Sequence, residues 1–340
     1  MTTPAATTAA PEPRLKHFPV AFFAIVMGLT GVSIAWHKAQ STFGITIDMA
    51  GGLLWVAIGV FALAVALYLT KLARFPQAVI KEIGNPVQLN FFPTISISLL
   101  LLGIALLTTA PAVAEVLWML GTALHLLLTI YVMSVWMHHD HFEIHHINPA
   151  WFIPIVGNVL VPIAGVPLGY GELSWFFFSI GLLFWLVMLT IIIYRMLFHH
   201  PLPERLMPTF FILIAPPAVG FIAYARLSGL MAMGPTMVTD MAGPDAFARI
   251  LYYSGLFLTL LLATQIGRFL RIQFYLSWWA YSFPLAAITI ATLMMYELTG
   301  LRAFAIIGWI LLAAVTLVVL FLLFRTAQAI GAKQICMPHV

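Results

Sequence analysis

Residues 302–325 read RAFAIIGWILLAAVTLVVLFLLFR, an apolar run with an arginine at each end. A helix of about 20 apolar residues is long enough to cross the hydrocarbon core of a bilayer. The same character extends along the chain, because 63% of its 340 residues are hydrophobic and only 8% are charged. A soluble domain carries about a quarter charged residues. The sequence therefore predicts an all-α integral membrane protein whose apolar surface faces lipid.

The length of the chain allows about ten transmembrane helices in a single domain, 18–325. We place the spans at 18–36, 51–73, 91–108, 112–136, 149–165, 174–197, 207–226, 246–269, 276–297 and 302–325. The fifth is short and contains two prolines. Residues 1–17 and 326–340 are predicted to form cytoplasmic tails, the first of them disordered because it is rich in Thr, Ala and Pro. The first apolar segment is interpreted as a span, not a signal peptide.

The basic residues indicate how the spans are oriented. With the N-terminus inside, eleven Lys and Arg residues fall on the inner side and four on the outer side. Inside loops of membrane proteins are enriched in such residues, so both termini are predicted to be cytoplasmic. A multi-pass protein of the bacterial inner membrane is expected. This bias also accounts for the pI near 9.3 without nucleic acid as a partner.

Prolines divide the predicted spans into two sets. Every odd-numbered span contains proline, and no even-numbered span has one in its interior. Proline removes a helix hydrogen bond, and the freed backbone groups are tolerated at membrane depth only against protein or water. We therefore predict five helical hairpins around a central pore, with kinked odd helices inside and even helices facing lipid. The kink and pore-lining candidates among the prolines are Pro19, Pro93, Pro154, Pro162, Pro216, Pro217 and Pro284.

The predicted centres of the odd spans carry hydroxyl and amide groups and almost no ionisable side chains. Acidic rings for cations and an Asp/Glu proton relay are missing from them. Kinked helices can point backbone N–H groups and half-helix dipoles at an anion. A neutral path with donors therefore favours small anions over cations, although it also suits water or a small neutral solute.

Four stretches of the odd spans carry a family resemblance. They are FPVAFFAIVMGLTG at 18–31, PAWFIPIVGNVLVPIAG at 149–165, FFILIAPPAVGFIAY at 210–224 and SWWAYSFPLAAITIA at 277–291. In order and spacing they resemble the tellurite-resistance/dicarboxylate transporter family, which includes bacterial TehA-type proteins and the slow anion channels of plant guard cells. The resemblance implies a ten-helix bundle of five hairpins around a pore, assembled as a homotrimer with one pore per subunit.

The resemblance also implies a phenylalanine that plugs the pore from the ninth helix, and the matching residue is Phe283. Because Phe283 precedes Pro284, the helix is expected to bend beside the ring. A bulky ring at such a bend can occlude a narrow neutral path and gate it. The alternative role for this ring is ordinary packing. Gly28, Gly31 and Gly157 either leave room opposite the ring or permit close packing of helices.

The preferred function is a gated anion-selective channel for small inorganic anions such as chloride or nitrate, without a cofactor. The alternative is a secondary transporter that exports oxyanions (tellurite, sulfite) or dicarboxylates such as malate, with possible proton coupling. Family members of both kinds exist, so the resemblance leaves the choice open. A channel gives unitary currents, whereas a carrier saturates and depends on a coupling ion.

The segment HHDHFEIHH at 138–146 raises a third alternative, a membrane metalloenzyme. Its His141, His145 and His146 resemble one histidine box of membrane di-iron desaturases. Such an enzyme needs further boxes, and only the pair His199–His200 remains. We therefore predict that the chain is not an enzyme and holds no metal, and that this loop instead responds to pH near the mouth of the pore.

His125 is predicted to lie in the middle of the fourth span, where an ionisable residue is a functional candidate. The fourth span is even-numbered and is expected to lie away from the axis. We interpret His125 as a neutral, hydrogen-bonded structural residue. Titration within the path would instead favour proton-coupled export.

Overall fold

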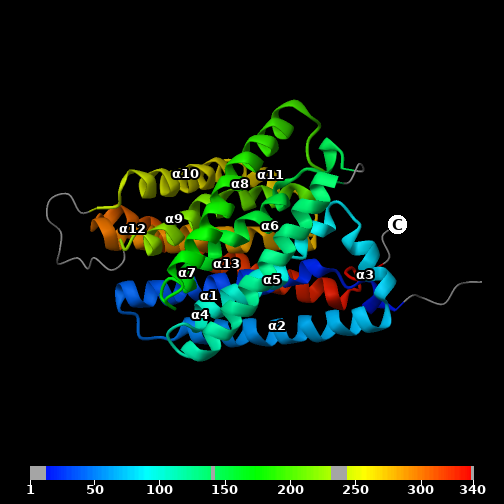
Figure 1. The fold of residues 1–340 in the computed structure, drawn as a ribbon, viewed down its shortest axis with the longest axis horizontal. Helices are drawn as coiled ribbons and strands as arrows, with labels where there is room; N and C mark the ends of the chain where they lie inside the picture. The colour runs from blue at the N-terminus through cyan, green and yellow to red at the C-terminus, as the bar shows by residue number, and fades with distance from the viewer. Residues whose placement is uncertain (1–12, 139–141, 231–242, 338–340) are drawn as a thin grey trace, which may run out of the picture.

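The computed structural model describes residues 13–138, 142–230 and 243–337, which form helices and connecting loops without a β-strand (Figure 1). Nine helical segments of this part are long and apolar enough to cross a membrane. They are Val20–Phe43, Met49–Arg74, Gln88–Leu106, Pro111–His138, Gly171–Phe198, Glu204–Leu227, Ala246–Ala263, Leu276–Thr299 and Arg302–Gly331. These segments confirm the all-α class and correspond to nine of the ten predicted spans.

The fifth predicted span has a different form. Pro149–Gly165 is apolar but shorter than the other nine. It consists of the 3-10 turn η5 (Pro149–Phe152), α6 (Ile153–Val156), the 3-10 turn η6 (Gly157–Leu160) and α7 (Val161–Gly165). Pro154 and Pro162 lie in the first turns of α6 and α7, where a missing N–H costs least. We call residues 153–165 the broken segment.

The other odd segments share one design, in which a 3-10 stretch leads into an α-helix. The pairs are η2 (Val20–Phe22) with α1 (Phe23–Phe43), η3 (Gln88–Phe91) with α4 (Thr94–Leu106), η7 (Glu204–Ile214) with α9 (Ala215–Leu227), and η9 (Leu276–Tyr281) with α12 (Ser282–Thr299). Prolines stand at or near these junctions. Pro284, for example, lies in the first turn of α12, so the predicted bend is a change from 3-10 to α-helix.

The even spans are continuous α-helices. They are α2 (Met49–Arg74), α5 (Pro111–His138), α8 (Gly171–Phe198), α10 (Ala246–Ala263) and α13 (Arg302–Gly331). Without interior proline, nothing interrupts their hydrogen bonding. The last of them extends beyond the predicted end at residue 325.

Burial separates the two sets of helices. In the most apolar window of each long odd span, 67 to 89% of the residues are buried, against 17 to 33% in the even spans. Each odd segment packs against the even helix that follows it, as α1 does against α2 and α12 against α13. The odd segments also contact one another in a closed order: α1 with α4, α4 with α7, α7 with α9, α9 with α12, and α12 with α1. An inner ring is therefore surrounded by five outer helices.

The connections contain one short helix that the sequence did not indicate, α3 (Pro76–Ile83), which lies towards the right-hand end of the molecule in Figure 1. The predicted eighth span, 246–269, is divided, because α10 ends at Ala263 and the separate short helix α11 (Ile266–Phe269) follows. Before the first span, Arg14–His17 form a 3-10 turn. Residues 1–12 and 338–340 of the predicted tails lie outside the described part of the chain.

Candidate functional site

Two cavities lie inside the ring of odd segments. The large cavity has a volume of about 500 Å³ and the small cavity a volume of about 140 Å³. Their linings come from the odd segments and the adjoining loops, and none of α2, α5, α8, α10 and α13 contributes a described residue to either. These two cavities therefore belong to the proline-containing inner ring, whereas a third cavity of about 100 Å³ is lined in part by α2 and by Asp48.

The two cavities meet at three apolar residues. Leu160 of η6, Val219 of α9 and Phe283 of α12 line both cavities, and we call these three residues the constriction. The ring of Phe283 faces α1, where a Cβ atom placed on Gly31 would lie 3.2 Å from its Cδ2 atom. Glycine at position 31 thus lets α1 approach the ring closely. The large and small cavities are separated by side chains, not by backbone.

The large cavity is mainly apolar, and its lining contains no carboxylate among the residues that the structure describes. Its wall includes Arg205 of η7 and His146 of the loop before the broken segment, together with the amides of Asn85 and Gln88. Aliphatic and aromatic side chains from all five inner segments form the rest. A solute in this cavity therefore meets hydrogen-bond donors and one permanent positive charge.

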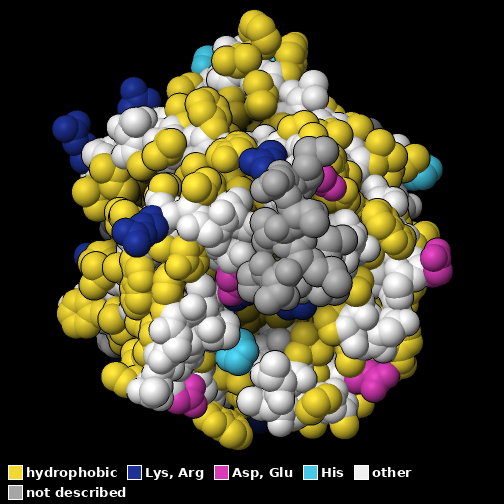
Figure 2. Space-filling model, turned by 90° about the vertical axis from the view of Figure 1, so that its left-hand side faces the viewer, with side chains coloured by type: hydrophobic (Ala, Val, Ile, Leu, Met, Phe, Trp, Pro, Cys, Tyr) yellow, Lys and Arg dark blue, Asp and Glu magenta, His cyan; other side chains and the backbone are white. Residues whose placement is uncertain are grey.

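The small cavity lies on the opposite side of the constriction and is more strongly basic. Lys38 and His37 of α1 and Arg226 of α9 line it, and again none of the described residues of its wall is a carboxylate. Figure 2 looks onto the end of the molecule where α1 and α12 finish. Hydrophobic side chains make up much of the rim of that face, and charged and histidine side chains also occur towards its middle (Figure 2). Lys38 and Arg226 thus place two basic side chains in the wall of the small cavity.

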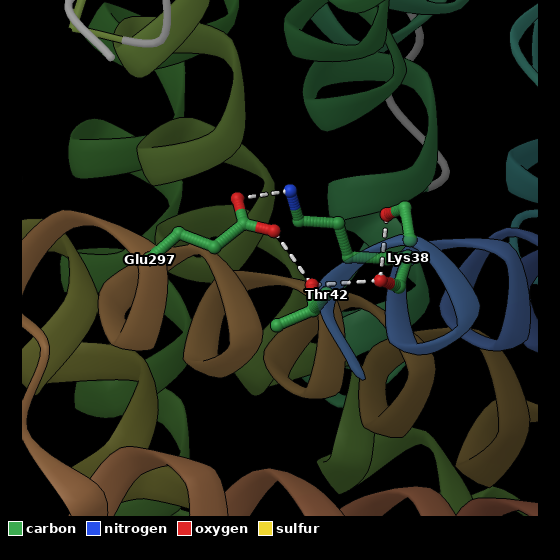
Figure 3. Close-up of polar contacts among 4 residues, drawn as sticks. Lys38, Thr42 and Glu297 are labelled. Atoms are coloured by element: carbon green, nitrogen blue, oxygen red, sulfur yellow. Dashed lines mark hydrogen bonds and ion pairs between the residues drawn. The ribbon is translucent and has the colours of Figure 1, made fainter. Parts of the chain in front are cut away.

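One of these cations is held by an acidic partner (Figure 3). The Lys38 ammonium forms an ion pair with the carboxylate of Glu297 near the end of α12. Thr42 Oγ1 donates to the other carboxylate oxygen at 2.6 Å. Glu297 does not itself line the cavity. Taken together, Lys38, Arg226 and Glu297 leave a net charge of about plus one beside the small cavity at neutral pH.

A second, fully buried ion pair stands at the opposite end of α1. Lys71 of α2 pairs with Glu82 of α3, and their side chains are 3% and 4% exposed. Lys71 Nζ also donates to the Phe18 carbonyl at 2.8 Å, and the Val20 N–H donates to Glu82 Oε1 at 2.6 Å. These bonds satisfy both buried charges and fix the residues on either side of Pro19, which lines the large cavity.

Five of the residues singled out in the sequence line one or both cavities. Pro19, Gly157 and Pro284 line the large cavity, Gly31 lines the small cavity, and Phe283 lines both. Gly28 instead provides close packing, because a Cβ atom there would lie 2.2 Å from Ser282 Oγ. The remaining candidates occupy helix starts and line neither cavity; they are Pro93, Pro154, Pro162, Pro216 and Pro217.

Sequence reasoning missed the charged residues beside the cavities. It counted Lys38 and Arg226 only as two of the four basic residues on the outer side. One signal was available, because these two lie at the ends of odd spans whereas Arg249 and Arg302 lie at the starts of even ones. Glu297 and Arg205 carried no comparable signal.

His125 lies behind the cavity wall. It is fully buried, and its Nδ1 atom is 2.8 Å from Ser96 Oγ. It lines neither cavity. This position agrees with the interpretation of His125 as a hydrogen-bonded residue away from the axis.

The histidine loop is described only in part, because residues 139–141 lie outside the described chain. Exposed His145 and Glu143 approach each other to 3.1 Å. Within the described ranges, no group of three or more His, Cys, Asp or Glu residues is arranged to hold a metal ion. His146 is the member of this loop that reaches the large cavity.

The fold and site define a multi-pass membrane protein with two internal cavities, whose described linings carry basic residues and no carboxylate and share three apolar residues. Comparison with known proteins identifies the family. Residues 17–327 match the family model SLAC1, described as voltage-dependent anion channel, and the chain belongs to this family. The family resemblance drawn from the four sequence stretches is confirmed. The family is one of channels, in agreement with the prediction that the chain is not an enzyme.

Several known proteins are similar in sequence to most of this chain. The S-type anion channel SLAH2 of Arabidopsis thaliana is 31% identical over 96% of this chain and 62% of its own length. The uncharacterized transporter MJ0762 of Methanocaldococcus jannaschii is 27% identical over 87% of this chain and 90% of its own. The tellurite resistance protein TehA homolog of Haemophilus influenzae is 26% identical over 85% of each. The chain spans 62% and 48% of the plant channels SLAH2 and SLAH3.

Proposed function

We propose that this protein is a gated, anion-selective channel for small inorganic anions such as chloride and nitrate, with Phe283 as its gate. The observation that carries the proposal is the position of Phe283 between two cavities lined by the inner segments. A ring that swings away from Leu160 and Val219 would join the cavities into one path. When the ring is in place, the three apolar side chains keep the path narrow and dry.

The charges along this path support anions as the solute. Arg205 stands in the large cavity, and Lys38 and Arg226 stand in the small cavity, while neither lining includes a carboxylate from the described ranges. Walls of low dielectric concentrate the field of such charges, which raises the local concentration of anions and repels cations. The constriction itself carries no charge, so an anion would cross it without being trapped at a fixed partner.

The proposed membrane arrangement rests on the number of spans and on the distribution of basic residues along the sequence. We take Pro149–Gly165 as the tenth span, which gives five hairpins around the pore and places both termini on one side. The excess of basic residues assigns that side to the cytoplasm of a bacterial inner membrane. The apolar outer helices would face lipid and neighbouring subunits of a homotrimer with one pore per subunit, as the family resemblance implies.

Secondary transport of oxyanions or dicarboxylates is the second candidate. The names of two relatives, a transporter and a tellurite resistance protein, favour considering it. A proton-coupled carrier needs a titratable group at the point where access alternates, and Leu160, Val219 and Phe283 provide none. The channel is therefore the proposal that the geometry supports better.

The test compares anion currents of the wild-type protein and Phe283→Ala in a planar bilayer. A gate held closed by about 1.4 kcal/mol leaves the path open about a tenth of the time, so truncation should raise the current by about tenfold. Phe221→Ala is the matched control, because Phe221 is a fully buried phenylalanine of α9 that lines neither cavity.

A large, anion-selective current in Phe283→Ala alone supports the gate. Equal currents in all three proteins would assign Phe283 to packing. If no protein conducts while liposomes take up substrate only with a pH gradient, the carrier replaces the channel.

A further inference from the structure

The outer helix α5 contacts the broken segment through an unusually polar stripe. Trp118, His125 and Thr129 lie on its buried face, and each is at most 2% exposed. The opposite face of α5 is apolar and exposed, as expected for a helix against lipid. Polar side chains buried between membrane helices bind partners that would otherwise stay unsatisfied. The partners here identify what the stripe does.

Three hydrogen bonds tie the broken segment to α5. Thr129 Oγ1 donates to the Pro154 carbonyl at 2.8 Å, and Trp118 Nε1 donates to the Val161 carbonyl at 2.9 Å. Asn158, from within the segment, donates through Nδ2 to Thr129 Oγ1 at 3.1 Å. The bonds therefore hold the segment on both sides of η6, and η6 contributes Leu160 to the constriction.

His125 lies between Trp118 and Thr129 on α5 and sets how closely the segment can approach this helix. A Cβ atom placed on Gly157 would lie 2.2 Å from His125 Cε1 and 2.4 Å from Nε2. The imidazole thus occupies the space that a side chain at position 157 would need. Its other edge is held by the Ser96 hydroxyl. His125 Nε2 has no hydrogen-bond partner within the described residues, so the ring is placed by packing as well as by hydrogen bonding.

The same segment forms the wall of the pathway on its other side. Val156 and Gly157 line the large cavity, and Leu160 lines both cavities. The segment is short and lacks the continuous hydrogen bonding of a regular helix, so its own backbone does little to fix its position. Any displacement away from α5 would move Leu160 towards Phe283. The distance between Gly157 and His125 is therefore coupled to the width of the constriction.

We propose that the contact between Gly157 and His125 sets the width of the pathway and so the largest anion that it admits, with Trp118 and Thr129 as further positioning residues. This inference rests on the proposed channel function. It assigns size selectivity partly to α5, a helix that does not line the path. The solutes concerned are monovalent inorganic anions distinguished by their radius.

The experiment uses Phe283→Ala as the parent protein, so that the gate does not mask the width of the path. Currents carried by chloride, bromide and iodide are compared, because the halides differ in radius while charge and shape stay the same. Adding Gly157→Ala should lower the iodide-to-chloride current ratio several-fold, since the methyl group pushes the broken segment towards the axis. Adding His125→Ala to that variant should restore the ratio, because the ring no longer occupies the space.

Gly121→Ala is the matched control on α5. A Cβ atom there would lie 3.0 Å from both Cγ and the backbone N of Leu100 and 3.1 Å from Leu99 Cβ on α4, and neither leucine lines a cavity. This variant should leave the halide ratio unchanged. A folded Gly157→Ala protein with an unchanged ratio would overturn the inference, as would a reduced ratio that His125→Ala fails to restore.

Two further measurements cover other outcomes. If Gly157→Ala does not fold, Thr129→Val should lower the ratio by releasing the Pro154 carbonyl, and an unchanged ratio would count against the inference. If the parent carries no anion current, the channel function fails, and the spacing is tested separately with Leu160→Cys in a Cys336→Ser background. Thiol reagents should then label position 160 less in Gly157→Ala and regain access in the double variant; equal labelling would refute the contact.

Discussion

Glu297→Gln should strengthen anion binding at the small cavity, because it removes the carboxylate that holds Lys38. An anion touching Lys38 Nζ from the cavity side would lie about 6 Å from that carboxylate. Two unit charges at this distance repel each other by about 3 kcal/mol at an effective dielectric constant of about 20, and by about 0.7 kcal/mol in bulk water. Salt screening favours the lower half of this range, so we expect about tenfold lower half-saturating chloride.

The assay is single-channel conductance against chloride concentration in the Phe283→Ala background. The controls are variants that change the net charge beside the small cavity by a known amount. The net charge beside the small cavity is about plus one in the parent, plus two in Glu297→Gln and zero in Lys38→Met, and it returns to plus one in the double variant. Half-saturating chloride should therefore fall, rise and return to the parental value in that order. An unchanged or higher value in Glu297→Gln would refute this electrostatic reasoning.

Two further predictions concern stability. Lys71→Met leaves the Glu82 carboxylate buried without its cation, and we expect a loss of about 3–5 kcal/mol in thermal or denaturant unfolding, with a smaller loss when Glu82→Gln is added. Asp245→Ala removes the N-cap of α10, in which Asp245 accepts from the Ala248 N–H at 2.8 Å, and should cost about 1 kcal/mol at neutral pH. Partial burial is the largest single influence on the pKa of Asp245 and raises it, but hydrogen bonds from the Ala248 N–H and the Tyr224 hydroxyl together bring it below its ordinary value. The free energy of unfolding of the wild type should therefore exceed that of Asp245→Ala at pH values above the ordinary pKa of an aspartate. This difference should disappear as the pH falls through the lowered pKa of Asp245, and a difference that does not depend on pH would contradict the prediction.

Much of the architecture could be predicted because it depends on local chemistry. Apolar runs of sufficient length specify spans, and proline marks the segments whose backbone needs protein or water around it. The described helices follow both patterns, since the proline-containing spans are the buried ones and line both cavities. The fifth span was the least regular in the sequence and is the most broken in the structure.

The charged groups at the small cavity could not be predicted in the same way. Lys38 and Glu297 are separated by 259 positions, and nothing in either neighbourhood indicates the other. Their pairing depends on the rotation of α1 and α12 about their axes, which places two helix ends side by side. A basic residue near a helix end has the same composition signature whether it faces lipid headgroups or a cavity.

Composition and proline spacing by themselves determined that this chain is a membrane protein of kinked inner and straight outer helices, because hydrophobicity and hydrogen-bond loss act residue by residue. The tertiary structure decided which side chains face one another across that ring. Phe283 lines both cavities together with Leu160 and Val219, and Gly157 packs against His125, although these residues lie far apart in the chain. Such contacts depend on the distance and rotation of packed helices, which no single segment specifies.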